Sequence, residues 1–136
     1  MEIRDFDKEK DYENLCKWWD DWGMPKYIPE ALSETGIIIS KDGVDICSAF
    51  IFSTDSYTCW IEYLTMNKNT TKEQRKGVLR GMFDALLERS TKMGFRLIMT
   101  LATEDQERKS PVLTRLKKEY FEIVTKNMTQ YYRVIN

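Results

Sequence analysis

The stretch "TTKEQRKGVLRGMFDALLER", residues 70–89, decides how this sequence is interpreted, because it fits two different structures. Two overlapping patterns at its start, Thr-x-x-Glu and Thr-x-x-Gln, match the capping box that begins an amphipathic helix and occupies its first main-chain amides. Gly77 and Gly81 would then lie inside the helix, where each glycine costs about 1 kcal/mol relative to alanine. The alternative is a loop that leads into a later helix start, where free main-chain amides can hold a phosphate group.

Length and composition bound the class of protein. The chain has 136 residues, so residues 1–136 are expected to form a single domain. The formal net charge of -1 argues against a dedicated nucleic-acid coat. Histidine is absent and the three cysteines lack C-x-x-C spacing, so neither a histidine-based catalytic triad nor a metal site is expected. Without a leader or an apolar run of about 20 residues, we expect a cytoplasmic protein with reduced cysteines and no membrane partner.

Hydrophobic periodicity predicts the order β-α-β-β-β-α-β-α-β, with a second closing strand as an option. This order predicts an α/β (α+β) protein with a single mixed, mostly antiparallel sheet of six to seven strands and helices on both faces. In the strand over 57–67, strict alternation places Glu62, Leu64 and Met66 on one face and Tyr63 and Thr65 on the other. Strands are predicted over 2–6, 36–40, 45–53, 57–67, 95–102 and 122–136, and helices over 11–23 (with Asp11 as cap), 70–93 and 110–121, with one further helical turn at 29–33.

Essentially the whole chain resembles the GNAT superfamily of acyl-CoA-dependent N-acyltransferases. The strongest local match runs from Ile61 to Arg96: "IEYLTM" corresponds to an "IExLxV"-like strand, "QRKGVL" (74–79) to a Q/R-x-x-G-x-G/A loop, and the following helix ends in "GF". Leu79 stands where the family has a second Gly or Ala. The tryptophan-rich first helix, the proline-containing loop and a C-terminal "T-x-Y" resemble divergent GNAT-like proteins of bacteriophages.

The resemblance implies acetyl-CoA as the co-substrate and no metal. In the family, glycines let the backbone approach the pyrophosphate at a helix start, and the thioester arm runs along the preceding strand. Ser110, which roughly matches a residue that contacts this arm, fits an ordinary helix N-cap as well. The implied cofactor-binding residues are Leu64, Thr65, Met66, Gln74, Arg75, Lys76, Gly77, Val78, Leu79, Arg80 and Ser110.

The same resemblance implies that Glu62 acts as the general base. Desolvation beside Trp60 could raise the pKa of Glu62 into a useful range, whereas the alternative role is an ordinary ion pair at the sheet surface. The family's general-acid tyrosine is missing, because Leu116 occupies its position. Tyr120, one turn further on, is the candidate that replaces it, with core packing as its alternative role.

Aromatic side chains flank the region that covers the acceptor cleft in this fold. Leu15, Trp18 and Trp22 share one helical stripe that is expected in the core, so Trp19 is the better candidate for an exposed ring. One of two neighbouring tyrosines on the last strand should also be exposed. The candidate acceptor-side residues are Trp19, Trp22, Tyr27, Tyr131 and Tyr132.

The leading hypothesis is an N-acyltransferase that moves an acetyl group from acetyl-CoA to a primary amine of a small molecule or protein. A catalytically degenerate GNAT-like binding module is the alternative, favoured by Leu79 and by the missing tyrosine. Binding of nucleic acid or another anion through basic helix ends is disfavoured, because no stacking motif accompanies the charge. The oligomeric state is left open, with a homodimer as one option.

Overall fold

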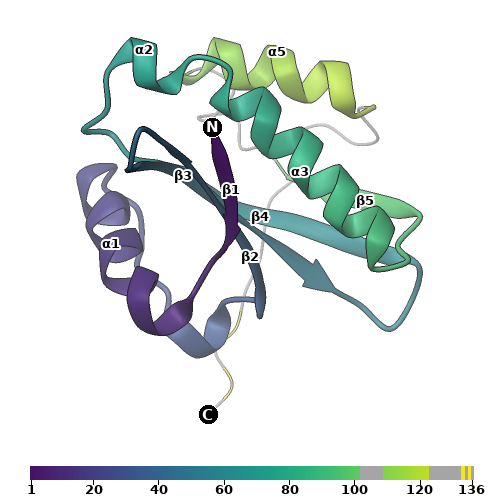
Figure 1. Cartoon of the computed structure of the whole chain (residues 1–136). Helices are drawn as coiled ribbons and strands as arrows, with labels where there is room; N and C mark the ends of the chain where they lie inside the picture. The colour runs from purple at the N-terminus through teal and green to yellow at the C-terminus, as the bar shows by residue number, and fades with distance from the viewer. Residues whose placement is uncertain (102–108, 123–132, 134, 136) are drawn as a thin grey trace. The chain divides into compact units, whose positions relative to one another are not determined.

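The computed structural model describes residues 1–101, 109–122, 133 and 135. They belong to two compact units, residues 1–101 and 102–136, which are described separately, so the expectation of a single domain stays a prediction. In the first unit, a five-stranded sheet has a helix on each of its faces (Figure 1). Together with the comparisons given below, this confirms the predicted fold class.

The strands follow one another across the sheet in chain order, β1-β2-β3-β4-β5. The first three pairings are antiparallel, and the pairing of β4 with β5 is parallel. A mixed, mostly antiparallel sheet is therefore confirmed, with five strands described instead of six to seven, while the predicted closing strands over 122–136 lie almost wholly outside the described residues. The strands are β1 (Glu2–Asp5), β2 (Thr35–Lys41), β3 (Val44–Ser53), β4 (Thr58–Met66) and β5 (Leu97–Thr100).

Helix α1 (Lys8–Asp21) covers one face of the sheet and begins earlier than the sequence predicted. The carboxylate of Asp7 caps it by accepting hydrogen bonds from the amides of Glu9 (3.0 Å) and Lys10 (3.3 Å). The prediction of Asp11 as cap is therefore wrong. Asp11 lies one turn inside the helix, where Arg4 holds it.

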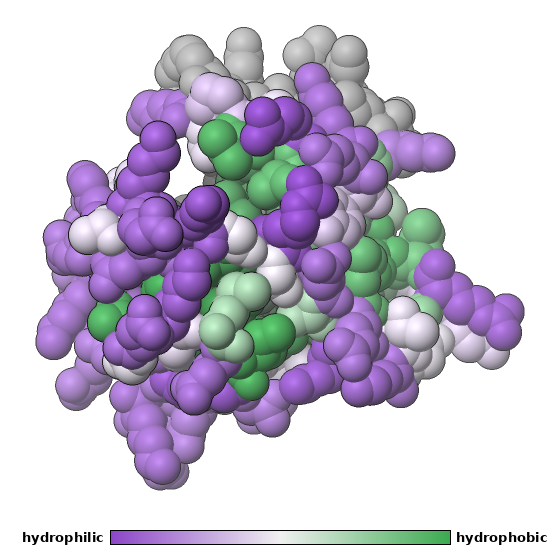
Figure 2. Space-filling model, turned by 45° about the horizontal axis from the view of Figure 1, so that its top comes forward, coloured by the Kyte–Doolittle hydropathy of each residue, from purple (hydrophilic) through white to green (hydrophobic). Residues whose placement is uncertain are grey.

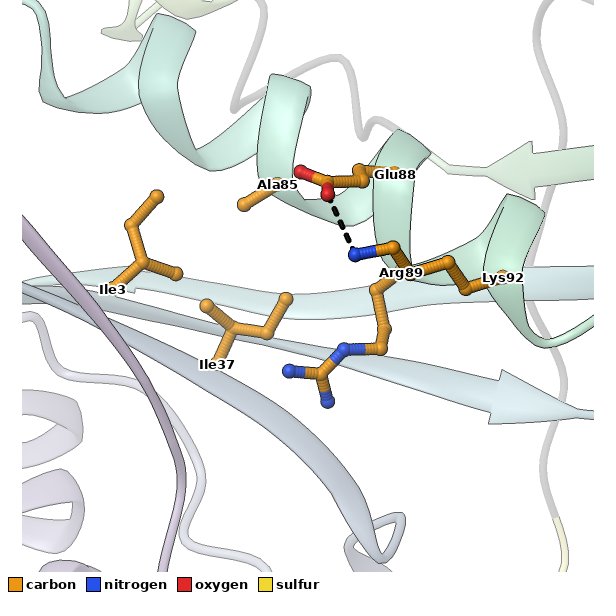
Figure 3. Close-up of a pocket in the computed structure, with 6 residues that line it drawn as sticks. All are labelled: Ile3, Ile37, Ala85, Glu88, Arg89 and Lys92. Atoms are coloured by element: carbon orange, nitrogen blue, oxygen red, sulfur yellow. Dashed lines mark hydrogen bonds and ion pairs between the residues drawn. The ribbon is translucent and has the colours of Figure 1, made fainter.

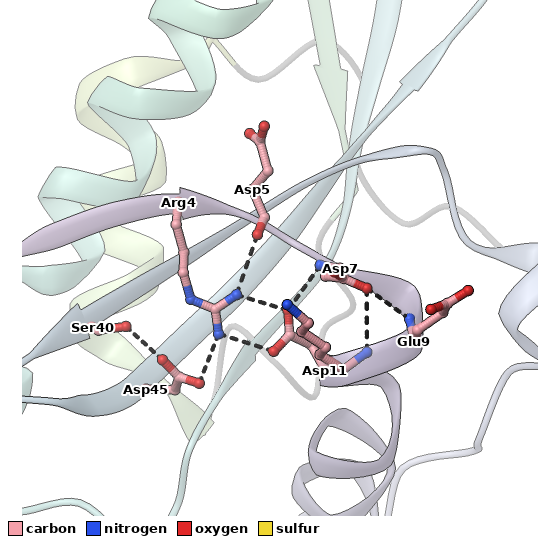
Figure 4. Close-up of polar contacts among 8 residues, drawn as sticks. Arg4, Asp5, Asp7, Glu9, Asp11, Ser40 and Asp45 are labelled. Carbon is pink, nitrogen blue, oxygen red and sulfur yellow. Dashed lines mark hydrogen bonds and ion pairs between the residues drawn. The ribbon is translucent and has the colours of Figure 1, made fainter.

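Arg4 joins three elements of the first unit (Figure 4). Its guanidinium donates two hydrogen bonds to the carboxylate of Asp11 in α1, at 2.8 and 2.9 Å, and a third to Asp45 in β3 at 3.0 Å. The bidentate contact lowers the pKa of Asp11, against the opposing effect of burial. This cluster fixes β1 and the start of α1 against β3.

Helix α3 (Val78–Lys92) covers the opposite face, after the single turn of α2 (Lys72–Arg75). Val78, Met82 and Leu86 are fully buried on its inner side. Gly81 lies inside α3, where an added Cβ atom would be 3.0 Å from the sulfur at the flexible end of the Met1 side chain. Between α1 and β2, the predicted turn is a 3-10 helix, η1 (Pro29–Ala31).

The second unit contains helix α5 (Pro111–Tyr120). Ser110 occupies the N-cap position, and its carbonyl accepts a hydrogen bond from the amide of Thr114 at 3.0 Å. Its side chain makes no capping hydrogen bond, so the predicted cap is right in position but not in its side-chain contact.

The outer surface is mainly hydrophilic on the face shown in Figure 2, where hydrophobic side chains gather in separate patches. Large exposed apolar side chains include Trp22 and Tyr57, which are 49% and 65% exposed. Within the described residues, no helix combines the length and the apolar character needed to cross a membrane.

Candidate cofactor and active site

The decisive stretch forms two helices separated by a left-handed glycine. Thr71 and Gln74 make the predicted capping box, with main-chain to side-chain hydrogen bonds of 3.1 and 2.8 Å, but this box caps only α2. The chain then leaves the helix at Lys76, and Gly77 adopts a φ of 78° before α3 begins at Val78. Both alternative interpretations of the sequence are therefore realised, one after the other.

The start of α3 leaves main-chain amides available. Its first main-chain hydrogen bond runs from Gly81 to the carbonyl of Gly77, at 3.0 Å, and no side chain caps the helix. Among the described residues, none accepts a hydrogen bond from the amides of Gly77, Val78 or Leu79. A Cβ atom added at Gly77 would meet no atom within 4 Å, so the approach to this helix start is open. Such an end carries about half a positive charge and suits an anion.

Lys41 is a functional candidate that the sequence analysis missed. Its ammonium donates to the carbonyls of Lys76 (3.0 Å) and Glu73 (3.4 Å), which stabilises the end of α2 and adds positive charge beside the Gly77 turn. Lys41 could have been found from the antiparallel pairing of β3 with β4. This pairing puts the start of β3, and with it the β2-β3 hairpin that contains Lys41, beside the end of β4, where the chain continues toward α2. Arg75 points back instead, and its guanidinium donates to the carbonyl of Thr70.

Strand β4 contains a bulge in its middle. Ser48 of β3 pairs with Thr65, and Phe50 pairs with Glu62, so β4 holds one residue more than β3 between these two pairs. Tyr63 has a φ of 56°, which is rare for a residue with a side chain. A bulge of this kind bends a strand and redirects the side chains that follow it.

The bulge makes the predicted alternation wrong beyond Glu62. Cys59 faces α3, where its thiol donates to Ser90 at 3.6 Å. Strict alternation would put Tyr63 and Thr65 on that same face. Instead, Thr65 accepts a hydrogen bond from the indole of Trp19 in α1 at 3.2 Å, and the ring of Tyr63 contacts the same indole.

The two parallel strands separate halfway along β4. Their last paired residues are Ile61 and Thr100, and β5 ends there. In the part of the chain that the structure describes, β4 continues from Glu62 to Met66 without a β5 partner. We call this unpaired side the open edge of β4. It contains the three strand residues predicted to contact a cofactor, Leu64, Thr65 and Met66, although the side chain of Thr65 is buried against α1.

Glu62 is half-buried on the α1 face of the sheet, opposite Phe50 in the strand pairing. The next residue, Tyr63, belongs to an aromatic cluster: its ring centroid is 4.6 Å from that of Tyr27 and 5.6 Å from that of Phe52. Burial raises the pKa of Tyr63, and the nearby Tyr27 and Glu62 raise it further. Glu62 therefore lies next in sequence to an aromatic cluster on the α1 face, half-buried and near enough to Tyr63 to affect its pKa.

The roles predicted for two tryptophans are reversed. Trp19 is fully buried and Trp22 is 49% exposed, so the prediction of an exposed Trp19 and a core Trp22 is wrong. The buried stripe of α1 runs through Asp11, Leu15, Trp18 and Trp19, and Trp22 is already the C-cap residue, where the helix has passed its contact with the sheet. Tyr27 packs against Trp19, with ring centroids 5.7 Å apart.

All of the predicted site roles stay predictions, and four of the predicted residues are not placed beside this site. Ser110 and Tyr120 belong to the second unit, and Tyr131 and Tyr132 lie outside the described residues. No group of three or more His, Cys, Asp or Glu side chains among the described residues is placed to hold a metal ion.

A hollow on the first unit lies away from this site (Figure 3). Three apolar residues and three charged residues from the last turns of α3 line it: Ile3, Ile37, Ala85, Glu88, Arg89 and Lys92. Glu88 and Lys92 form an ion pair of 2.7 Å across its rim. The charged side of the hollow is formed by the last turns of α3 and not by its start, so the hollow does not replace the site around Gly77 and Glu62.

Comparisons with solved structures identify the fold. An aminoglycoside acetyltransferase from an uncultured soil metagenomic sample, in complex with sisomicin, superposes with a TM-score of 0.72 over 99% of this chain and 96% of its own, at 11% identity. An aminoglycoside N-acetyltransferase in complex with CoA gives 0.64 over 98% and 100%, at 17% identity. Ard1 from Thermoplasma volcanium gives 0.69 over 91% and 83%, at 16% identity. Neither a scan against protein-family models nor a search of curated proteins found a match.

These likenesses, at low sequence identity and over nearly the full chain, establish the fold. The chain has the GNAT acetyltransferase fold, as the residues from Ile61 to Arg96 predicted. The break at Gly77 and the separation of β4 from β5 are the two places where this fold leaves groups available for chemistry.

Proposed function

We propose that this protein is an acetyl-CoA-dependent N-acetyltransferase that acetylates a primary amine. The observation that carries the proposal is the uncapped start of α3 after the left-handed Gly77, in a chain whose β4 has an open edge. A helix start binds phosphate through its amides, and an open strand edge binds an amide-containing chain through main-chain hydrogen bonds. Coenzyme A has both parts, a pyrophosphate and an arm with amide groups.

The residues around the break fit the phosphate end of this co-substrate. The amides of Gly77, Val78 and Leu79 would hold the pyrophosphate, and the ammonium of Lys41 keeps the preceding turn in place. Leu79 replaces the small residue usual in the family, but its role here requires only its main-chain amide. Gln74 and Arg75 are engaged with the loop before α2, so they support the turn and are not proposed to contact phosphate.

The chemistry is assigned to Glu62. Bound acetyl-CoA supplies an activated acetyl thioester. The carboxylate of Glu62, half-buried on the α1 face, accepts a proton from the attacking amine, directly or through a water molecule. Tyr120 stays the candidate that donates a proton to the leaving thiolate.

The acceptor is proposed to be a small molecule with a primary amine. Two of the similar structures are aminoglycoside acetyltransferases, which supports this class. Tyr27, Phe52 and Tyr63 provide an apolar surface on the α1 face for the body of such a molecule. Leu116, in place of the family's tyrosine, favours the second candidate function, a GNAT-shaped protein that binds without catalysis.

Ligand binding and turnover separate these functions. At a concentration 100 times its Kd, a ligand stabilises the fold by about 2.7 kcal/mol, so acetyl-CoA should raise the melting temperature clearly. Product CoA measured chromatographically with a panel of amines then reports turnover. Glu62→Gln should lower turnover at least about 100-fold without changing CoA affinity, whereas the control Glu88→Gln, on the exposed side of α3, should change neither. If acetyl-CoA binds but no amine in the panel is acetylated, the second function is favoured. If acetyl-CoA does not bind at millimolar concentration, the start of α3 is not a CoA site, and both the catalytic and the non-catalytic use of that site are refuted.

A further inference from the structure

Trp22 is a half-exposed tryptophan that is held in a defined position. It is the C-cap residue of α1, and its indole nitrogen donates a hydrogen bond to the carbonyl oxygen of Met66 at 2.8 Å. The ammonium of Lys68 lies 5.0 Å from the centroid of its ring and also donates to the carbonyl of Asp21 at 3.1 Å. The ring is therefore held by a hydrogen bond at its edge and by a cation over one face, although 49% of the residue stays exposed.

The carbonyl that Trp22 contacts belongs to the open edge of β4. The amide of Asn67 donates to Ile46 of β3 at 2.7 Å, so the main-chain groups of Asn67 face β3. Main-chain groups of consecutive strand residues point to alternate sides, so those of Met66 face away from β3. This is the side on which β4 has no β5 partner after Ile61, among the described residues.

We propose that Trp22 contacts the cofactor arm: its indole forms one side of the path along the open edge of β4 and shares the Met66 carbonyl with an amide of the pantetheine arm. This inference rests on the proposed function. It also moves Trp22 from the acceptor side, where the sequence placed it, to the cofactor side.

The chemistry of the three partners is compatible. A carbonyl oxygen has two lone pairs, so Met66 can accept a second hydrogen bond without losing the one from Trp22. The flat face of an indole buries aliphatic groups well, and the pantetheine arm is a chain of methylene groups between amides. Met66 is also the last residue of β4, from which the chain continues through the α2 turn to Gly77. If the pyrophosphate of CoA binds at the start of α3 and the pantetheine arm follows the open edge of β4, only the arm contacts Trp22.

Two ligands test whether Trp22 contacts only the arm of CoA and not its nucleotide end. Coenzyme A carries the arm, whereas 3′,5′-ADP carries only the nucleotide end. Titration calorimetry should show that Trp22→Ala weakens CoA binding about fivefold or more, because the arm loses the apolar contact with the indole, and leaves 3′,5′-ADP binding unchanged. Trp22→Phe keeps a ring and should lie between the wild type and Trp22→Ala. CoA should also change the tryptophan emission of the wild type, and Trp22→Phe should remove most of that change.

The failing outcomes are distinct. If Trp22→Ala binds CoA as tightly as the wild type does, or weakens both ligands equally, Trp22 has no role toward the arm. If the wild type binds 3′,5′-ADP and CoA with equal affinity, no arm site exists on the open edge, and this inference falls while the α3 phosphate site stands. If the wild type binds neither ligand, the proposed function itself is refuted, and the inference falls with it.

Discussion

Replacing Gly77 with alanine has two effects that can be measured separately: one on fold stability, through the left-handed backbone conformation, and one on the binding of phosphate at the start of α3. Gly77 has a φ of 78°, and the space in front of its Cα is open to a distance of 4 Å. Alanine therefore meets no steric clash in the folded protein, but it must adopt a left-handed conformation. The same change at Gly94, which has a φ of 90° and equally open surroundings just after α3, is a matched control.

The expected magnitudes follow from this geometry. A left-handed non-glycine residue costs about 1–2 kcal/mol, and the reduced freedom of the unfolded chain returns about 0.4–1 kcal/mol. Each variant should therefore lose about 1 kcal/mol of unfolding free energy, equivalent to about 3–5 °C in a chain of this size. At Gly77 the new methyl group also lies where a pyrophosphate would approach. Losing one charge-assisted hydrogen bond, worth about 1.5–3 kcal/mol, weakens CoA binding about 10- to 150-fold.

The assay pairs thermal melting with calorimetric titration of CoA for both variants. We expect similar losses in melting temperature and a loss of CoA affinity only in Gly77→Ala. Gly77→Asn refines the comparison, because asparagine tolerates the left-handed region better but still places a side chain before the amides. Equal CoA affinities for Gly77→Ala and Gly94→Ala would refute the assignment of the α3 start as the phosphate site.

Three further predictions test parts of the first unit. Lys41→Met removes the ammonium that supports the end of α2, and calorimetry should show about fivefold weaker CoA binding; unchanged affinity would exclude Lys41 from the site. Asp11→Asn breaks the contact with Arg4. Because Arg4 lowers the pKa of Asp11 below its unfolded value, the contact stabilises the fold above about pH 4 and is lost as the pH falls through the folded pKa. Urea denaturation should therefore show a loss of about 1–2 kcal/mol at pH 7 that shrinks toward pH 3, and a pH-independent loss would contradict this origin. Gly36→Ala places a Cβ atom 2.6 Å from the ring of Phe50 and should cost about 1–3 kcal/mol in the same measurement, so an unchanged midpoint would contradict the packing described.

Much of the first unit could be predicted because its signals are local. The Asp42-Gly43 turn, with φ values of 52° and 77°, follows from residues that tolerate positive φ. The capping box of Thr71 and Gln74 is equally local, as it joins residues three positions apart. The GNAT fold was accessible from the strand pattern, Gly77 and the helix end taken together.

The remaining features depend on contacts between distant residues. Nothing in the residues around Tyr63 marks a bulge, since neither glycine nor proline is present in β4, so the faces of Tyr63 and Thr65 could not be predicted. Asp7 and Asp11 are both suitable caps, and only the position of Arg4 on the neighbouring strand decides between them. The exposure of Trp22 depends on where the sheet ends beneath α1. This is set by tertiary packing, which cannot be predicted from the periodicity of hydrophobic residues in the helix.

Strand β1, which Arg4 anchors, is also the outermost described strand beside β2 and has only four residues. Three of them are charged, and all four are exposed. Sheet borders of this kind resist the addition of a foreign strand, because the incoming chain would have to strip water from charged groups in return for very few main-chain hydrogen bonds. The exposed charges of β1, Arg4 among them, therefore disfavour the pairing of a further strand at this border.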